Sequence, residues 1–411
     1  MLLGDSGSIW SALAPYASAP DHELAPSPRL DAALHALVAV LQGASVPPAV
    51  LAAASCSLAA PGQDGVLAAR AADVRDVAQR AEGELERAYA GIILSRLGSG
   101  AAAEVTAQDD AGVPREGWPD GFPPPAVVAL AAASRPFPYV DHYVRLVAAE
   151  AAALSAVIPE RSLSGKEAGT APGLRLAFCG SGPLPLTGCL LAAAGAAASV
   201  TLIDIDPSAV AVSSRLLDLW TAAGALRGGS VSVLCADATR VAFAVDPESV
   251  AARSPPPDTI ARVAADVVFV AALLPTAAKT AIAARMAAAA SIGPPAAATP
   301  VMAVRTAHGL TADLTYEASG RATLSRLLPF VGVVVPRTHE APVAAAAASG
   351  GGVRGEDPDE VLGWFPSEVL NSMELYGGGR GRGARPADRC ADCAGQAAVL
   401  TAGRTGGMSH E

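Results

Sequence analysis

The sequence lacks the positive charge that nonspecific nucleic-acid-binding proteins carry. Its 29 lysines and arginines are outnumbered by 39 aspartates and glutamates, which gives a formal net charge of −10. Phosphate backbones attract charge of the opposite sign, so we expect no nucleic-acid partner.

The sequence also has no long uninterrupted hydrophobic run, and its first residues lack the pattern of a signal peptide. The apolar stretch 265–286 is short of the ~20 uninterrupted residues that cross a bilayer, because it contains Asp266, Pro275, Lys279 and Arg285. The start, MLLGDSGSIW, has no basic region before an apolar core and does not resemble a signal peptide. Three of the six cysteines lie in apolar runs, which suggests buried thiols in a reducing compartment. We therefore expect a cytoplasmic location and no membrane partner.

The motifs of several enzyme classes are absent. There is no H-E-x-x-H, no G-x-S-x-G and no P-loop. The lone C-x-x-C pair, Cys390 and Cys393, is followed only by His410, whereas a zinc site requires a second pair of ligands. The neighbouring GGGRGRGAR run has few repeats and no aromatic residue, unlike RNA-binding segments. We expect no metal ligands, and we assign 377–411 to a disordered tail.

Two patterns divide the remaining chain. Apolar residues recur at helical spacing within 27–98, on a stripe formed by Leu30, Leu34, Leu37, Val38 and Leu41. A second long helix stops near Gly98, and another begins at about Asp141. This pattern predicts an N-terminal helical domain over 1–160, in which the Gly- and Pro-rich part 99–134 is a loop or insertion.

From residue 161 to residue 376, short β-prone runs alternate with Ala- and Leu-rich helical stretches. The runs are LRLAFCG, SVTLIDID, SVSVLCAD, DVVFVAAL, PVMAVRT, FVGVVVP and VLNSMELY. Such alternation predicts an α/β domain with a mostly parallel sheet and helices on both faces. The Gly-rich part 341–366 is expected to be an insertion.

The run FCGSGPLPLTG has features of a nucleoside-binding turn. Ligands of open α/β sheets bind at the carboxyl ends of strands, where Gly180, Ser181 and Gly182 allow a sharp turn and a close approach to the backbone. Pro183 and Pro185 lack the N–H donors that hold a pyrophosphate. The turn therefore favours an adenosine ligand without phosphate, such as S-adenosylmethionine (SAM), over NAD.

The following strand ends supply further groups for such a ligand. Asp204, about 20 residues past the turn, can accept hydrogen bonds from ribose hydroxyls, and Asp237 can accept one from an adenine amino group. Ile205, Ala238 and Ala271 complete the predicted SAM site. The alternative is a structural turn with solvated aspartates.

Several segments resemble the nicotianamine synthase family. GSGPLPLT resembles its signature loop, QRAEGELERAYA its AEG-x-LE helix, and PFPYVDHYVRLVAAE its FPY-x-x-x-Y-x-x-L segment. DVVFVAALLPTAAK, VRTAHGL, PRTHE and EVLNSMEL resemble its later strands. The resemblance covers 27–98, 136–340 and 367–376, and it implies a helical domain packed on a Rossmann-like SAM-binding domain.

The resemblance also implies a reaction. Three 3-amino-3-carboxypropyl units from three SAM molecules are joined into the metal chelator nicotianamine, and three methylthioadenosines leave, with no cofactor beyond SAM itself. The attacking amine must be neutral, so the site needs a base. The family's catalytic glutamate matches Glu86, or Glu84 if the register slips, and its tyrosine matches Tyr143. Both come from the helical domain, which implies a cleft between domains.

Four further residues are weaker candidates for the site. Arg305 could bind a substrate carboxylate bidentately, and His308, Tyr139 and Asn371 lie in matching segments. The plain alternatives are a solvated glutamate for Glu86 and an amphipathic core tyrosine for Tyr143.

Three other functions are compatible with these motifs. They are transfer of a single unit to another amine, as in opine-type metallophore synthesis, methyl transfer from SAM, and SAM binding without catalysis. The oligomeric state is not predicted.

Overall fold

The computed structural model describes residues 13–27, 29–30, 32–33, 65–99, 113–115, 118, 122–158, 174–245, 258–292, 300–306, 321–336, 361–365 and 372–377. His308, Asn371 and residues 378–411, including the C-x-x-C pair, lie outside the described residues. The predicted boundary between the two domains, near residue 160, also lies outside them.

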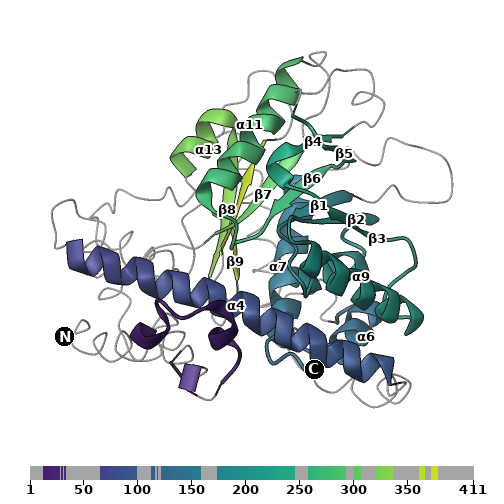
Figure 1. Cartoon of the computed structure of the whole chain (residues 1–411). Coiled ribbons are helices and arrows are strands. Elements are labelled where there is room, and N and C mark those ends of the chain that lie inside the picture. The colour runs from purple at the N-terminus through teal and green to yellow at the C-terminus, as the bar shows by residue number, and fades with distance from the viewer. Residues whose placement is uncertain are drawn as a thin grey trace, which may run out of the picture.

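Helices dominate the N-terminal part, as predicted. They are η1 (Ala14–Tyr16), η2 (Asp21–Leu24), α4 (Gly65–Gly98), α6 (Pro125–Ala133) and α7 (Val140–Val157). Figure 1 shows α4 as one long rod that crosses below the sheet, with η1 and η2 on its outer side.

Helix α6 shows that the prediction of a loop or insertion over 99–134 is wrong for its last part. Pro125 occupies the first turn, where a missing N–H costs nothing. Val127 and Leu130 are fully buried, and the helix packs against α7 and against α8 (Leu186–Ala193). The proline cluster GFPPP therefore marks the start of a core helix, which the polar composition before it concealed.

The sheet has eight strands among the described residues, in the order β3-β2-β1-β6-β7-β10-β8-β9. Their bounds are β1 (Arg175–Cys179), β2 (Ser199–Asp204), β3 (Val231–Cys235), β6 (Val267–Val270), β7 (Val301–Thr306), β8 (Phe330–Pro336), β9 (Val361–Phe365) and β10 (Ser372–Tyr376). Strand β10 is antiparallel to both neighbours, and every other pair is parallel. The predicted mostly parallel sheet is confirmed, but β9 falls inside the supposed insertion 341–366.

Helices cover both faces of this sheet. On one face lie α6, α7, α8 (Leu186–Ala193) and α9 (Pro207–Ala222), and on the other lie α11 (Thr276–Ile292) and α13 (Arg321–Leu327) (Figure 1). Alternate residues of β1 enter the two cores: Leu176 and Phe178 face one, Ala177 and Cys179 the other. Burial on both faces is typical of parallel sheets and explains the apolar runs of the sequence.

Smaller elements complete the fold. Strands β4 (Val241–Ala244) and β5 (Ala261–Ala264) form a separate parallel pair, preceded by the short helix η4 (Ala238–Arg240). Cys179 and Cys189 are fully buried, whereas Cys235 at the edge of the sheet is exposed. No helix among the described residues has the length and apolar character needed to span a bilayer.

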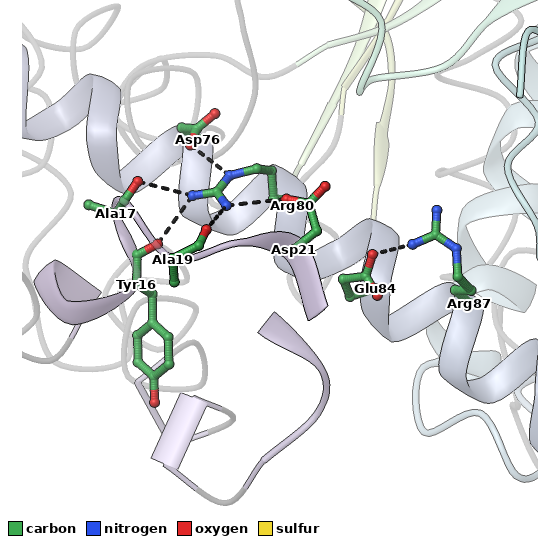
Figure 2. A network of polar contacts seen from close by, with 8 residues as sticks. All are labelled: Tyr16, Ala17, Ala19, Asp21, Asp76, Arg80, Glu84 and Arg87. Atoms are coloured by element: carbon green, nitrogen blue, oxygen red, sulfur yellow. Dashed lines mark hydrogen bonds and ion pairs between the residues drawn. The ribbon is translucent and has the colours of Figure 1, made fainter. Parts of the chain in front are cut away.

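Arg80 ties the N-terminal segment to α4, as Figure 2 shows. Its guanidinium donates hydrogen bonds to the backbone oxygens of Tyr16 at 3.1 Å, Ala17 at 3.1 Å and Ala19 at 2.6 Å. It also pairs with Asp21 and Asp76. One charged group thus binds three backbone carbonyl groups of η1 and the turn after it, and the Tyr16 oxygen also accepts a hydrogen bond from the Ala19 N–H at 3.2 Å. The outer surface of α4 is fixed by this contact.

Glycine 188 of α8 is required by the contact between α8 and β2. A Cβ at this position would lie 2.6 Å from Leu202 Cδ2 and 3.2 Å from Val200 Cγ1. We expect Gly188→Ala to lower the free energy of unfolding by about 1–3 kcal/mol, because overpacking outweighs the gain in helix propensity. Gly91→Ala is the matched control, since nothing lies within 4 Å of its Cβ position. It should raise stability by about 0.5–1 kcal/mol in the same urea titration; equal effects of the two variants would contradict this packing.

Candidate active site

A cavity of about 370 Å³ opens at the carboxyl ends of β1, β2, β3 and β6. The strand order reverses at β1, which pairs with β2 on one side and β6 on the other. Open α/β sheets bind ligands at such a reversal. The sheet side of the cavity is lined by 180–188, 203–205, 236–239 and 271–275. Helix α4 closes the cavity with Glu82, Gly83 and Glu86.

The backbone N–H donors of the glycine turn are already engaged in hydrogen bonds within the protein. The N–H groups of Gly180 and Ser181 donate to the carbonyl oxygen of Ile203 at 2.8 and 3.2 Å. The N–H of Gly182 donates to Asp204 Oδ2 at 2.8 Å. Pro183 follows and has no N–H. From residue 180 to residue 183 every backbone donor is therefore engaged or missing, so the turn is a poor cradle for phosphate.

Both glycines of the turn have positive φ angles, and both are in contact with neighbouring elements. Gly180 has φ 76° and Gly182 has φ 66°. A Cβ at Gly180 would lie 2.0 Å from Leu274 Cδ1, and one at Gly182 would lie 2.7 Å from Glu86 Oε2. The turn and the carboxylate of α4 can approach this closely only because residue 182 has no side chain.

The predicted acids at the strand ends also line the cavity. Asp204 accepts a second hydrogen bond from the N–H of Asp206 at 3.0 Å. Asp237 Oδ1 accepts from the N–H of Thr239 at 2.9 Å and from its hydroxyl at 2.7 Å. Both carboxylates are thus held in place by backbone donors. The Ile205 side chain beside them is 68 % exposed and provides an apolar surface at the cavity rim.

Ser181 contributes a buried hydroxyl to the same wall. The residue is only 6 % exposed, and its Oγ has no hydrogen-bond partner among the described residues. A buried donor without a partner is costly, so such a group in a cavity wall is suited to a ligand.

Glu86 and Tyr143 meet across the cavity from α4 and α7. The Tyr143 hydroxyl donates to Glu86 Oε1 at 3.2 Å. Burial, then the Glu82 charge, raises the pKa of Glu86 from 4.5 to about 8, against the opposing effects of Tyr143 and Arg305; Asp204 adds a small increase. Burial and the Glu86 charge also raise the pKa of Tyr143 well above its usual value. Tyr143 therefore stays protonated as the donor, while Glu86 titrates near neutral pH.

The helical periodicity of α4 places its three glutamates on two different faces of the helix. Glu82 and Glu86 are four residues apart, so they share one face and line the cavity. Glu84 points elsewhere and pairs with Arg87 (Figure 2). Arg87 in turn lies 3.8 Å from Asp206 at the start of α9. The geometry brings Glu86, not Glu84, to the glycine turn. Glu82 was known from the sequence as a neighbour of Glu86 but received no predicted role, although its i, i+4 spacing from Glu86 was a usable signal.

Arg305 lines the cavity but already binds a carboxylate of the protein. Its Nε and Nη2 donate to the two oxygens of Glu150 at 2.7 and 2.9 Å, and both residues are buried. The guanidinium also lies 5.4 Å from the Phe269 ring and 5.9 Å from the Tyr143 ring. Burial raises the pKa of Glu150, and Arg305 opposes that increase. The bidentate fork that we expected for a substrate carboxylate is thus engaged with α7 instead.

Most of the predicted site residues lie together. The cavity wall includes Glu86, Tyr143, Gly180, Ser181, Gly182, Pro183, Asp204, Ile205, Asp237, Ala238, Ala271 and Arg305. Tyr139 instead lies at the start of α7 with its ring 5.6 Å from the Phe137 ring, away from the wall. No group of three or more His, Cys, Asp or Glu suited to a metal occurs among the described residues.

Fold and site define an α/β protein of the Rossmann-like type, with a nucleoside-sized cavity closed by an N-terminal helical layer. Residues 131–245 match the family model described as nicotianamine synthase protein. The family resemblance inferred from the sequence is thereby confirmed over this segment. It contains Tyr143, the glycine turn and Asp204. A comparison with curated protein sequences gives no significant match.

Solved structures named MtNAS have the same fold. A point mutant of MtNAS superposes with a TM-score of 0.54 at 17 % identity, over 92 % of this chain and 98 % of that chain. MtNAS in complex with MTA and tNA gives 0.54 at 16 % identity over the same shares. The mutant in complex with S-adenosylmethionine gives 0.51 at 17 % identity, over 90 % and 97 %. The predicted Rossmann-like architecture with an N-terminal helical part is confirmed.

The raised pKa of Glu86 predicts a pH-dependent stability. Below about pH 4.5 the carboxyl is protonated in both the folded and the unfolded state, and its stabilising effect is complete. Between pH 4.5 and about 8 the folded state holds a proton that the unfolded state releases, so stability falls as pH rises. We expect this group to account for a loss of up to about 5 kcal/mol over that interval.

Urea titrations at several pH values test this expectation. Glu86→Gln should flatten the slope of unfolding free energy against pH between 5 and 8, relative to the wild type. Glu84→Gln, which removes a carboxylate of the same helix that pairs with Arg87 and does not line the cavity, should keep the wild-type slope. Identical slopes for wild type and Glu86→Gln would show that Glu86 has an ordinary pKa.

Proposed function

We propose that this protein is a nicotianamine synthase. It condenses three SAM molecules by 3-amino-3-carboxypropyl transfer, releases three 5′-methylthioadenosines and supplies a metal chelator, with no cofactor beyond SAM. The observation that carries this proposal is the contact between Glu86 and the Gly182 turn, because it puts a base of raised pKa directly beside a SAM-type loop. The matched family segment contains that loop and Tyr143.

The adenosine end of SAM is assigned to the sheet side of the cavity. Asp204 keeps lone pairs beyond the two that backbone N–H groups use, and these suit the ribose hydroxyls. Asp237, at the end of β3, suits the adenine amino group, while Ile205 and Ala271 provide apolar surface for the ring. The buried Ser181 hydroxyl gains a partner when the ligand binds.

The reacting end lies under α4. The neutral amine of the acceptor attacks Cγ of the donor SAM, a new N–C bond forms, and the electrons of the S–Cγ bond move to sulfur. Methylthioadenosine leaves as a neutral thioether. The surplus proton of the amine nitrogen passes to the Glu86 carboxylate, which Tyr143 orients through its hydrogen bond. The Arg305 charge helps to keep Glu86 ionised, as the base must be.

The cellular setting follows from the substrate and the thiols. We place the reaction in the cytoplasm, as the buried thiols of Cys179 and Cys189 suit a reducing compartment. SAM is the partner, and neither a nucleic acid nor a membrane is required.

Incubation with SAM alone, followed by mass spectrometry, separates this function from its rivals. We expect nicotianamine and three methylthioadenosines per product molecule. A product that forms only when another amine is added would indicate transfer of a single unit. Release of S-adenosylhomocysteine would indicate a methyltransferase, and binding without turnover would indicate a noncatalytic module.

The base assignment has its own test. Glu86→Gln should lower kcat at least ~10²-fold, because the amide accepts no proton and this is the usual contribution of a general base. Glu84→Gln is the matched control and should retain near wild-type kcat, since Glu84 pairs with Arg87 away from the cavity. Methylthioadenosine release at saturating SAM provides the measurement. Full activity of Glu86→Gln, or loss of activity in Glu84→Gln alone, would refute the assignment.

A further inference from the structure

The proposed mechanism leaves one carboxylate of the cavity without a role. Glu82 lies on α4 four residues before Glu86 and lines the same cavity. Four residues of helix correspond to a rise of about 6 Å, so Glu82 lies about one turn from the base. Its charge reaches Glu86, since it opposes ionisation of that carboxyl. Two like charges this close are unfavourable in an empty cavity and favourable around a cation.

The rest of the cavity wall also carries mainly negatively charged groups. Asp204 and Asp237 add two more carboxylates. Arg305 is the only Lys or Arg among the described lining residues, and Glu150 already neutralises it. The Ser181 hydroxyl, buried and without a partner among the described residues, independently marks this wall as a place for a ligand. The cavity therefore favours a ligand that carries positive charge.

The position of that charge follows from the reaction. The sulfonium of SAM is bonded directly to the carbon that the amine attacks, so it must lie near the amine that Glu86 deprotonates. SAM also carries an ammonium group, but the position of that group depends on the conformation of the amino-acid tail. The position of the sulfonium does not. In a cavity of reduced dielectric constant, Glu82 at about one helical turn from Glu86 acts strongly on such a charge.

We propose that Glu82 is a specificity residue that recognises the sulfonium charge, and so distinguishes the substrate SAM from the neutral thioether product. This inference rests on the proposed function. When the S–Cγ bond breaks, its electron pair neutralises sulfur. The attraction to Glu82 ends at that moment, and methylthioadenosine is released in favour of the next SAM.

Binding must be measured without turnover, so the test uses Glu86→Gln as the parent protein. Isothermal titration calorimetry at one pH compares SAM with S-adenosylhomocysteine and methylthioadenosine, which are both thioethers. Adding Glu82→Gln should weaken SAM binding about tenfold and change the binding of the two thioethers less than about twofold. S-adenosylhomocysteine keeps the amino-acid tail, so it separates recognition of the sulfonium from recognition of the ammonium group.

Two matched variants in the same parent protein control for folding and for helix charge. Glu84→Gln removes a carboxylate of α4 that pairs with Arg87 and does not line the cavity, and it should leave all three affinities unchanged. Glu82→Asp keeps the charge and should restore SAM binding to within about threefold of the parent. Melting temperatures confirm that each variant is folded.

The outcomes separate this inference from the proposed function. Unchanged SAM affinity in Glu82→Gln would overturn it, as would an equal loss for SAM and S-adenosylhomocysteine, or a loss that Glu82→Asp does not restore. If the parent protein bound no SAM at all, the proposed function itself would fail.

Discussion

The missing side chain at Gly182 is the constraint on which the site depends. A Cβ there would collide with Glu86 Oε2 at 2.7 Å, so the Glu86 carboxylate can lie this close to the loop only while this position stays glycine. The same residue has a positive φ of 66° and uses its N–H to fix Asp204. Turn geometry, the placement of Asp204 and the approach of Glu86 are thus set at one position. A larger residue would disturb all three together.

The position of α4 is supported by apolar packing on both sides of the cavity. Val74 and Val77 pack with the N-terminal segment, and Arg80 adds its bonds to the turn after η1 (Figure 2). Farther along, Ile93 and Leu97 enter the main core. Apolar burial at the two ends offsets the cost of burying acids in the middle, which is the expected balance for a functional site. The buried Glu150–Arg305 pair then joins α7 to β7 beside the cavity, at a desolvation cost that only good geometry recovers.

Local sequence patterns allowed the sheet, and the side of the cavity formed by its strand ends, to be predicted from the sequence. Strand ends follow from short apolar runs, and the carboxyl ends of parallel strands must share one edge, so Asp204 and Asp237 could be assigned to one ligand. Contacts between distant segments could not be predicted in this way. Glu150 and Arg305 are separated by 155 residues, and no local pattern pairs them. Helix α6 was missed because the polar, Gly- and Pro-rich residues before it resemble a loop. Its own residues are apolar on nearly every side, so they show no amphipathic pattern.

The charges of the cavity also explain how the Glu86 carboxyl can be stable in the empty site and serve as the proposed base in the occupied one. In the empty cavity burial and Glu82 favour the protonated form of Glu86, whose pKa is about 8. A cation bound beside these two acids favours the ionised form, so binding of SAM and loss of the Glu86 proton must promote one another. A phosphate ligand would reverse that coupling, and the turn at Gly180 to Pro183 offers it no free N–H. The glycine turn and the acids of α4 therefore select the same ligand by independent means, one through its missing donors and the other through its charge.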